Sequence, residues 1–267
     1  AKFTVYRNEK SNPHSLLNDY VRTLYEDKQG RLFIGSLNGL QIYDRATASF
    51  TTIPMYLSSG ASIDPNIATI LERNNGEILI GTSGHSMFLL ETRGDSIKAR
   101  QISRFISSNL ITYAYEDRKG NLWIATGDNG IFRFDKNNQS KHYSGEKDIA
   151  KNTVSSMCED KQGNLYMSSL KKGLFIYDDK KDVFIPFTDT PNPDLPIKIL
   201  YPGDQNEIFI GTDGSGMKVY DTQEQKIKEA NFNITTFNLK KAKVHSILKD
   251  KIGNIWLGFF QKGVMII

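Results

Sequence analysis

One pattern of 15 residues recurs six times along the chain, and it constrains the fold more than any other feature of the sequence. Its first copy, residues 21–35, holds an apolar stretch, the turn Asp27-Lys28-Gln29-Gly30 and a second apolar stretch. The last residues of successive copies lie 43 to 47 positions apart, a period typical of the blades of a β-propeller. The remaining copies are Ile67–Gly81, Ile111–Ala125, Val154–Ser168, Ile197–Gly211 and Val244–Gly258.

Each part of the repeat has a structural explanation. The first stretch is rich in β-forming residues and predicts a strand. The Asp-x-x-Gly turn predicts a hairpin, because Asp accepts backbone N–H groups and Gly adopts positive φ. In the fifth copy Asn206 takes the glycine position, and asparagine tolerates this conformation best after glycine. The second stretch, such as residues 32–35, is continuously apolar, which predicts a strand covered on both faces.

Small residues recur at two positions of the repeat. Gly, Ala or Ser ends the second stretch in every copy, which predicts a close approach of another backbone. A weaker fourth strand is expected after the third, for example at residues 49–53 or 183–187, where Pro186 suits an outer edge strand. The second small position opens the third strand and is held by Gly39, Ser86, Gly130, Gly173, Gly216 and Gly263.

These observations predict an all-β fold, a β-propeller of four-stranded blades in a single domain of residues 1–267. A propeller covers both faces of each blade, whereas a two-sheet sandwich would favour alternating strands. Residues 1–6 include a strand without a blade, and they are expected to complete the sixth blade, which lacks a fourth strand. The alternative is that the six copies form part of a seven-bladed or larger propeller. The blades are expected near residues 21–54, 67–106, 111–144, 154–188, 197–237 and 244–267.

Composition excludes several classes of protein. No apolar run approaches the roughly 18 residues of a membrane span, and the first residues lack the pattern of a signal peptide. Because the chain begins almost directly in a strand, we expect an excised fragment or a processed product. The formal net charge is +4, but the lysines are spread over turns, which favours solvated turns over a polyanion-binding face. The single cysteine excludes an intrachain disulfide.

The sequence Asp-Arg-Lys-Gly-Asn-Leu-Trp-Ile-Ala-Thr at residues 117–126 resembles the two-component regulator propeller repeat. Residues 2–16 are also similar to the connection between blades in that family, whereas copies two and five depart most, with Leu79 and Phe209 in the Trp column. The resemblance implies the periplasmic sensor region of a hybrid two-component system, in which a sensor histidine kinase and a transcriptional regulator share one polypeptide. Many members in gut bacteria respond to oligosaccharides.

No catalytic or metal-binding group emerges from the sequence. Cys158 shares a column with residues such as Tyr25 and Leu71, which favours a small core filler over a nucleophile. Trp123 and Trp256 share a column with Phe33 and similar residues, which favours packing between blades over sugar stacking. The four histidines lack ligand-like spacing, so no metal and no cofactor are expected.

Candidate binding residues lie in the connections that the repeat does not specify. Those between second and third strands hold amides and charges that can bind a sugar or an acidic glycan, although for any single residue an ordinary solvated loop is the favoured explanation. The candidates are Asn38, His85, Asp128, Asn129, Lys171, Lys172, Asp213, Gln261 and Lys262. The connections between blades add Asn18, Asp19, Asn66, Asn109, Asn152 and His245.

The sequence therefore predicts a non-catalytic periplasmic sensor module that binds an oligosaccharide or other small ligand and passes the signal to a kinase. Another sensor chain, in a homodimer, is an expected partner. Nucleic acid is not an expected partner, and this region is not expected to contact a membrane directly. Two alternatives stay open: a protein-interaction scaffold, and a propeller lyase or glycosidase. The enzyme would need paired carboxylates or a His–Tyr arrangement.

Overall fold

The computed structural model describes residues 3–94, 96–103, 105–106, 108–144, 154–188, 194–230 and 238–267. Within these ranges the chain consists of β-strands, and its helical content is the 3-10 turn η2 (Leu239–Lys241). No helix in the described part of the chain is long and apolar enough to cross a membrane. Two compact units are distinguished: the first comprises residues 1–116, 120–128 and 132–141, and the second comprises residues 117–119, 129–131 and 142–267.

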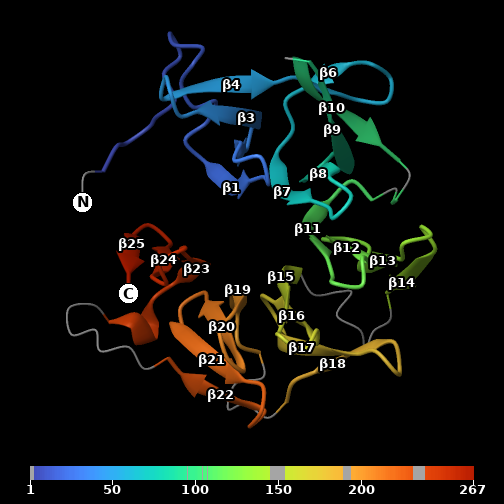
Figure 1. The fold of residues 1–267 in the computed structure, drawn as a ribbon, viewed down its shortest axis with the longest axis vertical. Coiled ribbons are helices and arrows are strands. Elements are labelled where there is room, and N and C mark those ends of the chain that lie inside the picture. The colour runs from blue at the N-terminus through green and yellow to red at the C-terminus, as the bar shows by residue number, and fades with distance from the viewer. Residues whose placement is uncertain are drawn as a thin grey trace. The chain divides into compact units, whose positions relative to one another are not determined.

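Each copy of the repeat forms its own sheet, in which the strands of that copy run antiparallel and adjoin in chain order (Figure 1). The first unit holds the first two sheets and most of the third. The first sheet contains β1 (Val21–Glu26), β2 (Leu32–Ser36), β3 (Gly39–Asp44) and β4 (Ser49–Ile53). The second contains β7 (Ile67–Glu72), β8 (Ile78–Thr82), β9 (Met87–Arg93) and β10 (Ser96–Ile102). The third contains β11 (Ile111–Glu116), β12 (Leu122–Thr126), β13 (Ile131–Phe134) and β14 (Ser140–Tyr143).

The second unit holds the other three sheets. The fourth contains β15 (Val154–Glu159), β16 (Leu165–Ser169), β17 (Gly173–Asp178) and β18 (Val183–Pro186). The fifth contains β19 (Ile197–Pro202), β20 (Glu207–Thr212), β21 (Met217–Asp221) and β22 (Lys226–Glu229). The sixth contains β23 (Val244–Lys249), β24 (Ile255–Phe259) and β25 (Gly263–Ile266). The expected fold class, an all-β propeller with six blades, is confirmed. Pro186 ends the edge strand β18, as expected.

The second sheet carries two strands that the repeat does not predict. After β4 the chain forms β5 (Met55–Tyr56) and β6 (Ser62–Ile63), and β5 pairs in parallel with β10. The second sheet thus has six strands in the order β6-β5-β10-β9-β8-β7. The added hairpin covers the outer edge of β10, which would otherwise leave its backbone groups free to pair elsewhere.

The strand expected at the N-terminus is not formed. Residues 3–6 lie outside any strand, and β25 pairs with β24 alone among the described strands. The ring of Tyr6 packs instead against the rings of Tyr43 and Phe50, with centroids 5.6 and 5.3 Å away, and its hydroxyl lies 2.6 Å from that of Tyr43. Phe3 and Val5 stay exposed. The expected strand is therefore absent at residues 3–6, because side-chain packing anchors Tyr6 to β3 and β4, and residues 1 and 2 lie outside the described residues. The completion of the sixth blade by this segment stays a prediction.

Within each unit, neighbouring blades pack face to face, and the core lies between them. We call the face of a blade that meets the preceding blade its leading face, and the face that meets the following blade its trailing face. Phe33 and Leu40 on the trailing face of the first blade pack with Ile67 and Ile70 on the leading face of the second. The same columns meet in the other interfaces within a unit, those between blades two and three, four and five, and five and six.

The small residue that ends the second strand has the role expected of it. A Cβ added to Gly35 would lie 2.6 Å from Cγ2 of Ile67 in the next blade and 2.6 Å from Cγ2 of Thr23. Gly81 stands in the same relation to Ile111. Real Cβ atoms do not approach other atoms this closely, so these positions admit the first strand of the next blade only because they lack a side chain.

The hairpin turns also follow the prediction, with one exception. The turn glycines of the other five copies, such as Gly30 and Gly76, have φ between +79° and +99°. Asn206 does not have a positive φ, so the expectation that it adopts the glycine conformation in the fifth copy is wrong. That turn lacks the repeat's Asp and closes through the N–H of Gly203, which donates to the carbonyl of Glu207 over 2.8 Å.

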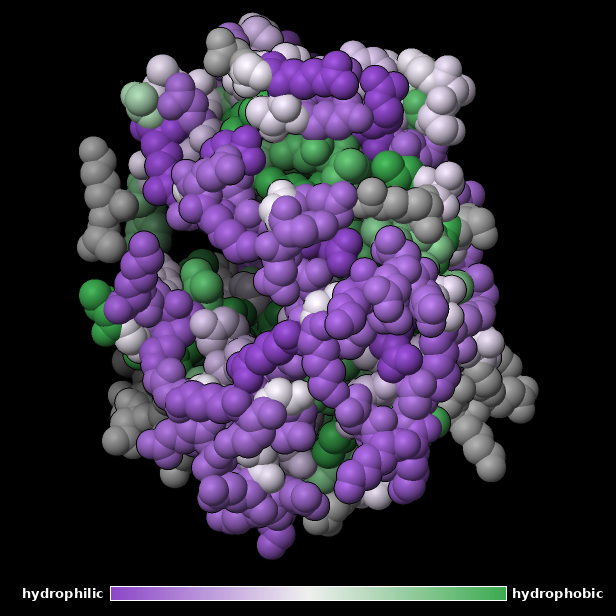
Figure 2. All heavy atoms as spheres, turned by 45° about the vertical axis from the view of Figure 1, so that its right-hand side comes forward, coloured by the Kyte–Doolittle hydropathy of each residue, from purple (hydrophilic) through white to green (hydrophobic). Residues whose placement is uncertain are grey.

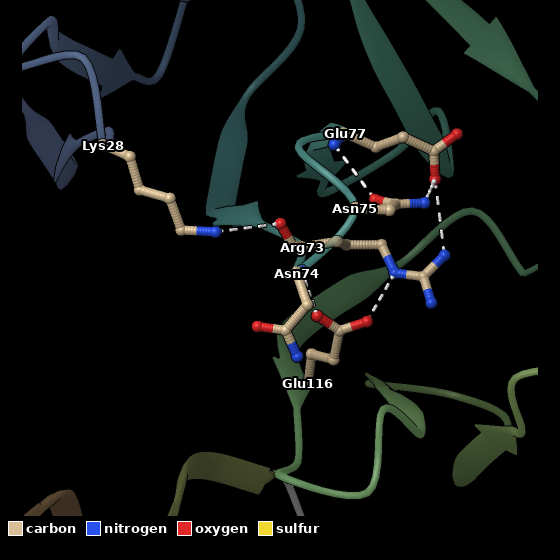
Figure 3. Close-up of polar contacts among 6 residues, drawn as sticks. All are labelled: Lys28, Arg73, Asn74, Asn75, Glu77 and Glu116. Atoms are coloured by element: carbon tan, nitrogen blue, oxygen red, sulfur yellow. Dashed lines mark hydrogen bonds and ion pairs between the residues drawn. The ribbon is translucent and has the colours of Figure 1, made fainter.

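The last residue of the first strand joins successive blades at their turns. Glu72 accepts the backbone N–H of Lys28 over 2.9 Å, and Glu159 accepts that of Arg118 over 2.9 Å. Glu116 accepts the N–H of Asn74 and also pairs with Nε of Arg73 at 3.0 Å (Figure 3). The Arg73 and Glu116 side chains are only 11% and 6% exposed. These contacts fix one turn against the next.

Candidate functional site

Two kinds of connection meet at one edge of every blade, which we call the loop edge. The register pairs the first residue of each first strand with the last residue of the second strand, as Val21 with Ser36 and Ile197 with Thr212. The connection that follows the second strand then forms a backbone hydrogen bond to the residue directly before the first strand. For example, the N–H of Asp213 donates to the carbonyl of Pro196 over 2.8 Å. Most of the predicted binding residues therefore lie at this edge, and the Asp-x-x-Gly turns lie at the opposite, turn edge.

In the first unit, predicted residues at the loop edge bond to one another. Asn18 donates through Nδ2 to Oδ1 of Asn38 over 3.2 Å. Nη1 of Arg22 in the first blade donates over 2.9 Å to Oδ1 of Asn66, which directly precedes the second blade. Arg22 is the second residue of β1, a position that the loop-based prediction missed because the repeat assigns it to a strand.

The remaining candidates of this unit are held by their surroundings. Asp128 accepts a hydrogen bond from the Ser108 hydroxyl over 2.6 Å. His85 is fixed through its backbone: its N–H donates to Thr82 Oγ1 over 3.1 Å, and its carbonyl accepts from Nε2 of Gln101 over 3.0 Å. The carbonyls of Asn66 and Asn109 accept backbone N–H groups of the β8–β9 connection.

In the second unit the predicted residues of the third and fourth blades are exposed. The carbonyl oxygen of Asn129 lies 2.6 Å from Nε2 of His142. Both Lys171 and Lys172 donate backbone N–H groups to the hydroxyl of Ser169. The ammonium of Lys172 pairs with Asp194 at 2.9 Å, with both side chains more than half exposed. Asn152 lies outside the described residues.

Asp213 lies at the centre of the densest polar cluster at this edge. Its Oδ1 is 3.2 Å from Nζ of Lys243 and 3.3 Å from Nε2 of His245. Partial burial works against ionisation, but the hydrogen bonds from Lys243 and His245 outweigh it and hold the pKa of Asp213 below its usual value. The Phe260 ring lies beside both side chains, with its centroid 5.2 Å from that of the His245 ring and 5.5 Å from the Lys243 ammonium.

The backbone of the fifth blade positions this cluster. The carbonyl of Ala242 accepts the N–H of Gly216 over 3.0 Å, and a Cβ on Gly216 would lie 2.3 Å from the carbonyl oxygen of Leu239. The glycine thus lets the connection that follows β22 lie directly over the β20–β21 loop. Sequence analysis named Asp213 and His245 but missed Lys243 and Phe260. Their positions directly before β23 and directly after β24 are the signal that could have identified them.

The loop edge of the second unit carries more positive than negative charge. Lysines occur in the β16–β17 loop, in the connection before β23 and in the β24–β25 loop, where Gln261 and Lys262 are exposed and Gln261 has a φ of +57°. Among the described loop-edge residues of this unit, the lysines are Lys171, Lys172, Lys240, Lys241, Lys243 and Lys262, and the acidic residues are Asp194 and Asp213. Such an edge favours anionic ligands.

The residues that could suggest catalysis are instead structural. Cys158 is buried, and burial raises the pKa of its thiol far above the usual range, which makes the thiol poorly suited to act as a nucleophile. Trp123 is fully buried, while Nε1 of Trp256 donates to Asp250 over 2.9 Å in the turn. Among the described residues, no three His, Cys, Asp or Glu side chains converge as metal ligands would.

Comparisons with known proteins agree with the repeat. The model of the family described as two component regulator propeller matches residues 15–38, 106–128 and 148–171. These segments contain the first, third and fourth copies, so the resemblance noted in the sequence is confirmed. No curated protein matches the chain.

Solved structures share the fold. The chain is similar to the extracellular domain of a hybrid two-component system from B. thetaiotaomicron, with 18% identity and a TM-score of 0.78 over 98% of this chain and 36% of that one. A second such domain from the same organism gives 21% identity and a TM-score of 0.51 over 92% and 38%. The chain therefore spans little more than a third of their length.

A third similar structure is a catalytically inactive variant of virginiamycin B lyase from Staphylococcus aureus with quinupristin. It gives 14% identity and a TM-score of 0.68 over 94% of this chain and 81% of that one. At such identities the likeness to all three structures concerns the fold alone.

Proposed function

We propose that this chain is an extracytoplasmic sensor module of a hybrid two-component signalling protein. In this proposal it lies in the periplasm, binds an oligosaccharide at the loop edge and passes the signal to a histidine kinase in the same polypeptide. The repeat family and the likeness to extracellular domains of hybrid two-component systems support this role.

The observation that carries the ligand assignment is the charge of the loop edge in the second unit. Among the described residues, this edge carries six lysines and two aspartates, and one of the aspartates, Asp213, is already paired with Lys243. An oligosaccharide that bears carboxylate or sulfate groups fits this surface best. Lysine ammonium groups would pair with its anionic groups, and asparagine and glutamine side chains such as Gln261 would bond its hydroxyls.

The module is proposed to bind without catalysis. The hydrogen bonds from Lys243 and His245 lower the pKa of Asp213, so this carboxyl group is poorly suited to act as a general acid. The likeness to a lyase concerns the fold alone. Enzymatic turnover by this chain is one of the outcomes that the experiment below distinguishes.

The test is calorimetric titration of residues 1–267 with two sets of oligosaccharides, one neutral and one bearing uronate or sulfate groups. We expect binding in the acidic set, with affinity that falls as salt concentration rises. Replacing Lys240 and Lys241 together by alanine should weaken binding about tenfold, because two exposed charge contacts contribute about 0.7 kcal/mol each. The matched control replaces Lys119 and Lys251, which lie in hairpin turns at the turn edge.

Each outcome decides between the candidate functions. Binding without turnover, lost in the loop-edge variant and kept in the turn-edge variant, supports the sensor. Turnover of a bound oligosaccharide would establish an enzyme, and absence of binding in both sets would favour an interaction scaffold. The site would be refuted if affinity stayed unchanged in each of the single variants Asp128→Ala, Lys171→Ala and Asp213→Ala and also in the double variant of Lys240 and Lys241.

A further inference from the structure

Asp213 occupies the place at which an anionic group of a ligand would bind. Its Oδ1 lies 3.2 Å from Nζ of Lys243 and 3.3 Å from Nε2 of His245. An ionised carboxylate can only accept hydrogen bonds, so both nitrogens donate to this one oxygen. Two nitrogen donors that converge on one point are also the arrangement that binds a carboxylate or sulfate oxygen of a ligand. A carboxylate of the chain itself already fills this position.

The backbone holds Asp213 in place. Asp213 and Lys243 form a β-bridge between the β20–β21 loop and the segment before β23. The hydroxyl of Thr212 closes the loop, because it accepts the N–H of Ser215 over 2.9 Å and donates to the carbonyl of Gly216 over 2.6 Å. The position of Asp213 is thus set by the loop and does not depend on a bound ligand.

The two donors can turn to a ligand without disturbing the core. The side chains of Lys243, His245 and Asp213 are 49%, 29% and 38% exposed. A partly exposed pair of this kind contributes little to stability, so exchanging its partner costs little. An anionic group of a ligand can therefore reach the two donors, but it must displace Asp213 and lies close to the negative charge of this residue.

The charge of Asp213 matters because its surroundings are positive. Among the described residues, the loop edge of the second unit carries six lysines and two aspartates. The other aspartate, Asp194, pairs with Lys172, and both side chains are more than half exposed, whereas Asp213 bridges two donors. Hydrophilic residues also predominate on the face of the molecule drawn in Figure 2, and at such surfaces charge contributes strongly to specificity.

We propose that Asp213 is an internal competitor that keeps small anions out of the ligand site. This inference rests on the proposed function, in which an acidic oligosaccharide binds at this edge. A small anion meets only the donor pair of Lys243 and His245, and there it gains too little to displace Asp213. An acidic oligosaccharide also contacts neighbouring residues such as Lys240 and Lys241, and these contacts supply what the displacement costs.

The first experiment uses inorganic sulfate as the probe, at constant ionic strength, and follows the imidazole signals of His245 by NMR. The chain has four histidines, and a His245→Gln variant assigns these signals. Sulfate should bind about fivefold more tightly in Asp213→Asn than in the wild type, because the variant keeps the shape of the side chain and removes its charge. Asp204→Asn is the matched control: it removes the same charge from a pair with Lys249 at the turn edge and should leave the affinity unchanged.

A double-mutant cycle tests whether Lys243 is the group for which Asp213 and the anion compete. Lys243→Ala should weaken sulfate binding about fivefold in the Asp213→Asn background and less than about twofold when Asp213 is present, because Lys243 is then already paired. Equal effects in the two backgrounds would overturn the proposal. So would sulfate that binds Asp213→Asn no more tightly than the wild type, or that leaves the His245 signals unchanged in every variant.

Titration with the acidic oligosaccharides separates this inference from the proposed function. Where one of them binds, added sulfate should compete with it in Asp213→Asn and not in the wild type. Competition of equal strength in both chains would contradict the role of Asp213. If no acidic oligosaccharide binds the wild type, the proposed function fails, whereas the sulfate measurements still decide whether Asp213 keeps anions from the donor pair.

Discussion

The contact between Glu116 and the preceding turn offers a quantitative test of how the blades are joined. Glu116→Ala removes the carboxylate that accepts the N–H of Asn74 and pairs with Arg73. Breaking a buried ion pair by removing one partner costs about 3–5 kcal/mol, and an unsatisfied buried N–H adds about 1–3 kcal/mol. Arg73 keeps Glu77 at 3.3 Å, and the Asn74 N–H can gain water. We therefore expect a loss of about 3 kcal/mol in the free energy of unfolding.

Glu26 supplies the matched control. It ends β1 as Glu116 ends β11, but its carboxylate is 53% exposed and pairs with the exposed Arg45. Exposed pairs of this kind contribute about 0–1 kcal/mol, so Glu26→Ala should cost less than about 1 kcal/mol. Urea unfolding followed by tryptophan fluorescence and circular dichroism gives both values. Equal losses in the two variants, or a loss below about 1 kcal/mol for Glu116→Ala, would refute the reasoning.

Three further predictions concern packing, reactivity and pH. Gly81→Ala should lower the free energy of unfolding by about 1–3 kcal/mol, because its Cβ would lie 2.6 Å from Cγ2 of Ile111; urea unfolding measures the loss, and a neutral effect would contradict it. Cys158 should resist aromatic disulfide reagents in the native chain and react once urea unfolds it, since burial raises the pKa of its thiol; fast native labelling would be inconsistent with this. The pKa of Asp213 is lowered in the folded chain, so its stabilising contribution is full above the unfolded pKa and is lost as pH falls through the folded value. Asp213→Asn should therefore reduce the drop in unfolding free energy between neutral and acidic pH by less than about 1 kcal/mol, because the carboxylate is more than a third exposed, and a larger drop in the variant would argue against the assignment.

The repeat was sufficient to predict the blades, because the same physical demands recur in each copy. Gly35 and Gly81 lack a side chain where the next blade approaches, and turn glycines such as Gly30 adopt positive φ. Cys158 was assigned to the core from its column alone, and it is buried. Such columns report local packing that does not depend on the rest of the chain.

Features that occur only once in the chain could not be predicted from the repeat. The β5–β6 hairpin forms by pairing with β10, a contact between segments that share no pattern. Residues 3–6 have the composition of a strand, but they form none, and Tyr6 packs on Tyr43 and Phe50. The cluster around Asp213 depends on the path of the connection before β23, and this path is set by contacts with Gly216 that the sequence does not display.

The location of the bound ligand tests the central claim most directly. Hydrogen–deuterium exchange of residues 1–267 would be compared with and without the acidic oligosaccharide that binds most tightly in the titration. The account predicts slower exchange at the loop edge of the second unit, at residues 238–243 and 260–262. Slower exchange confined to the hairpin turns, such as residues 27–30 and 160–163, would contradict it.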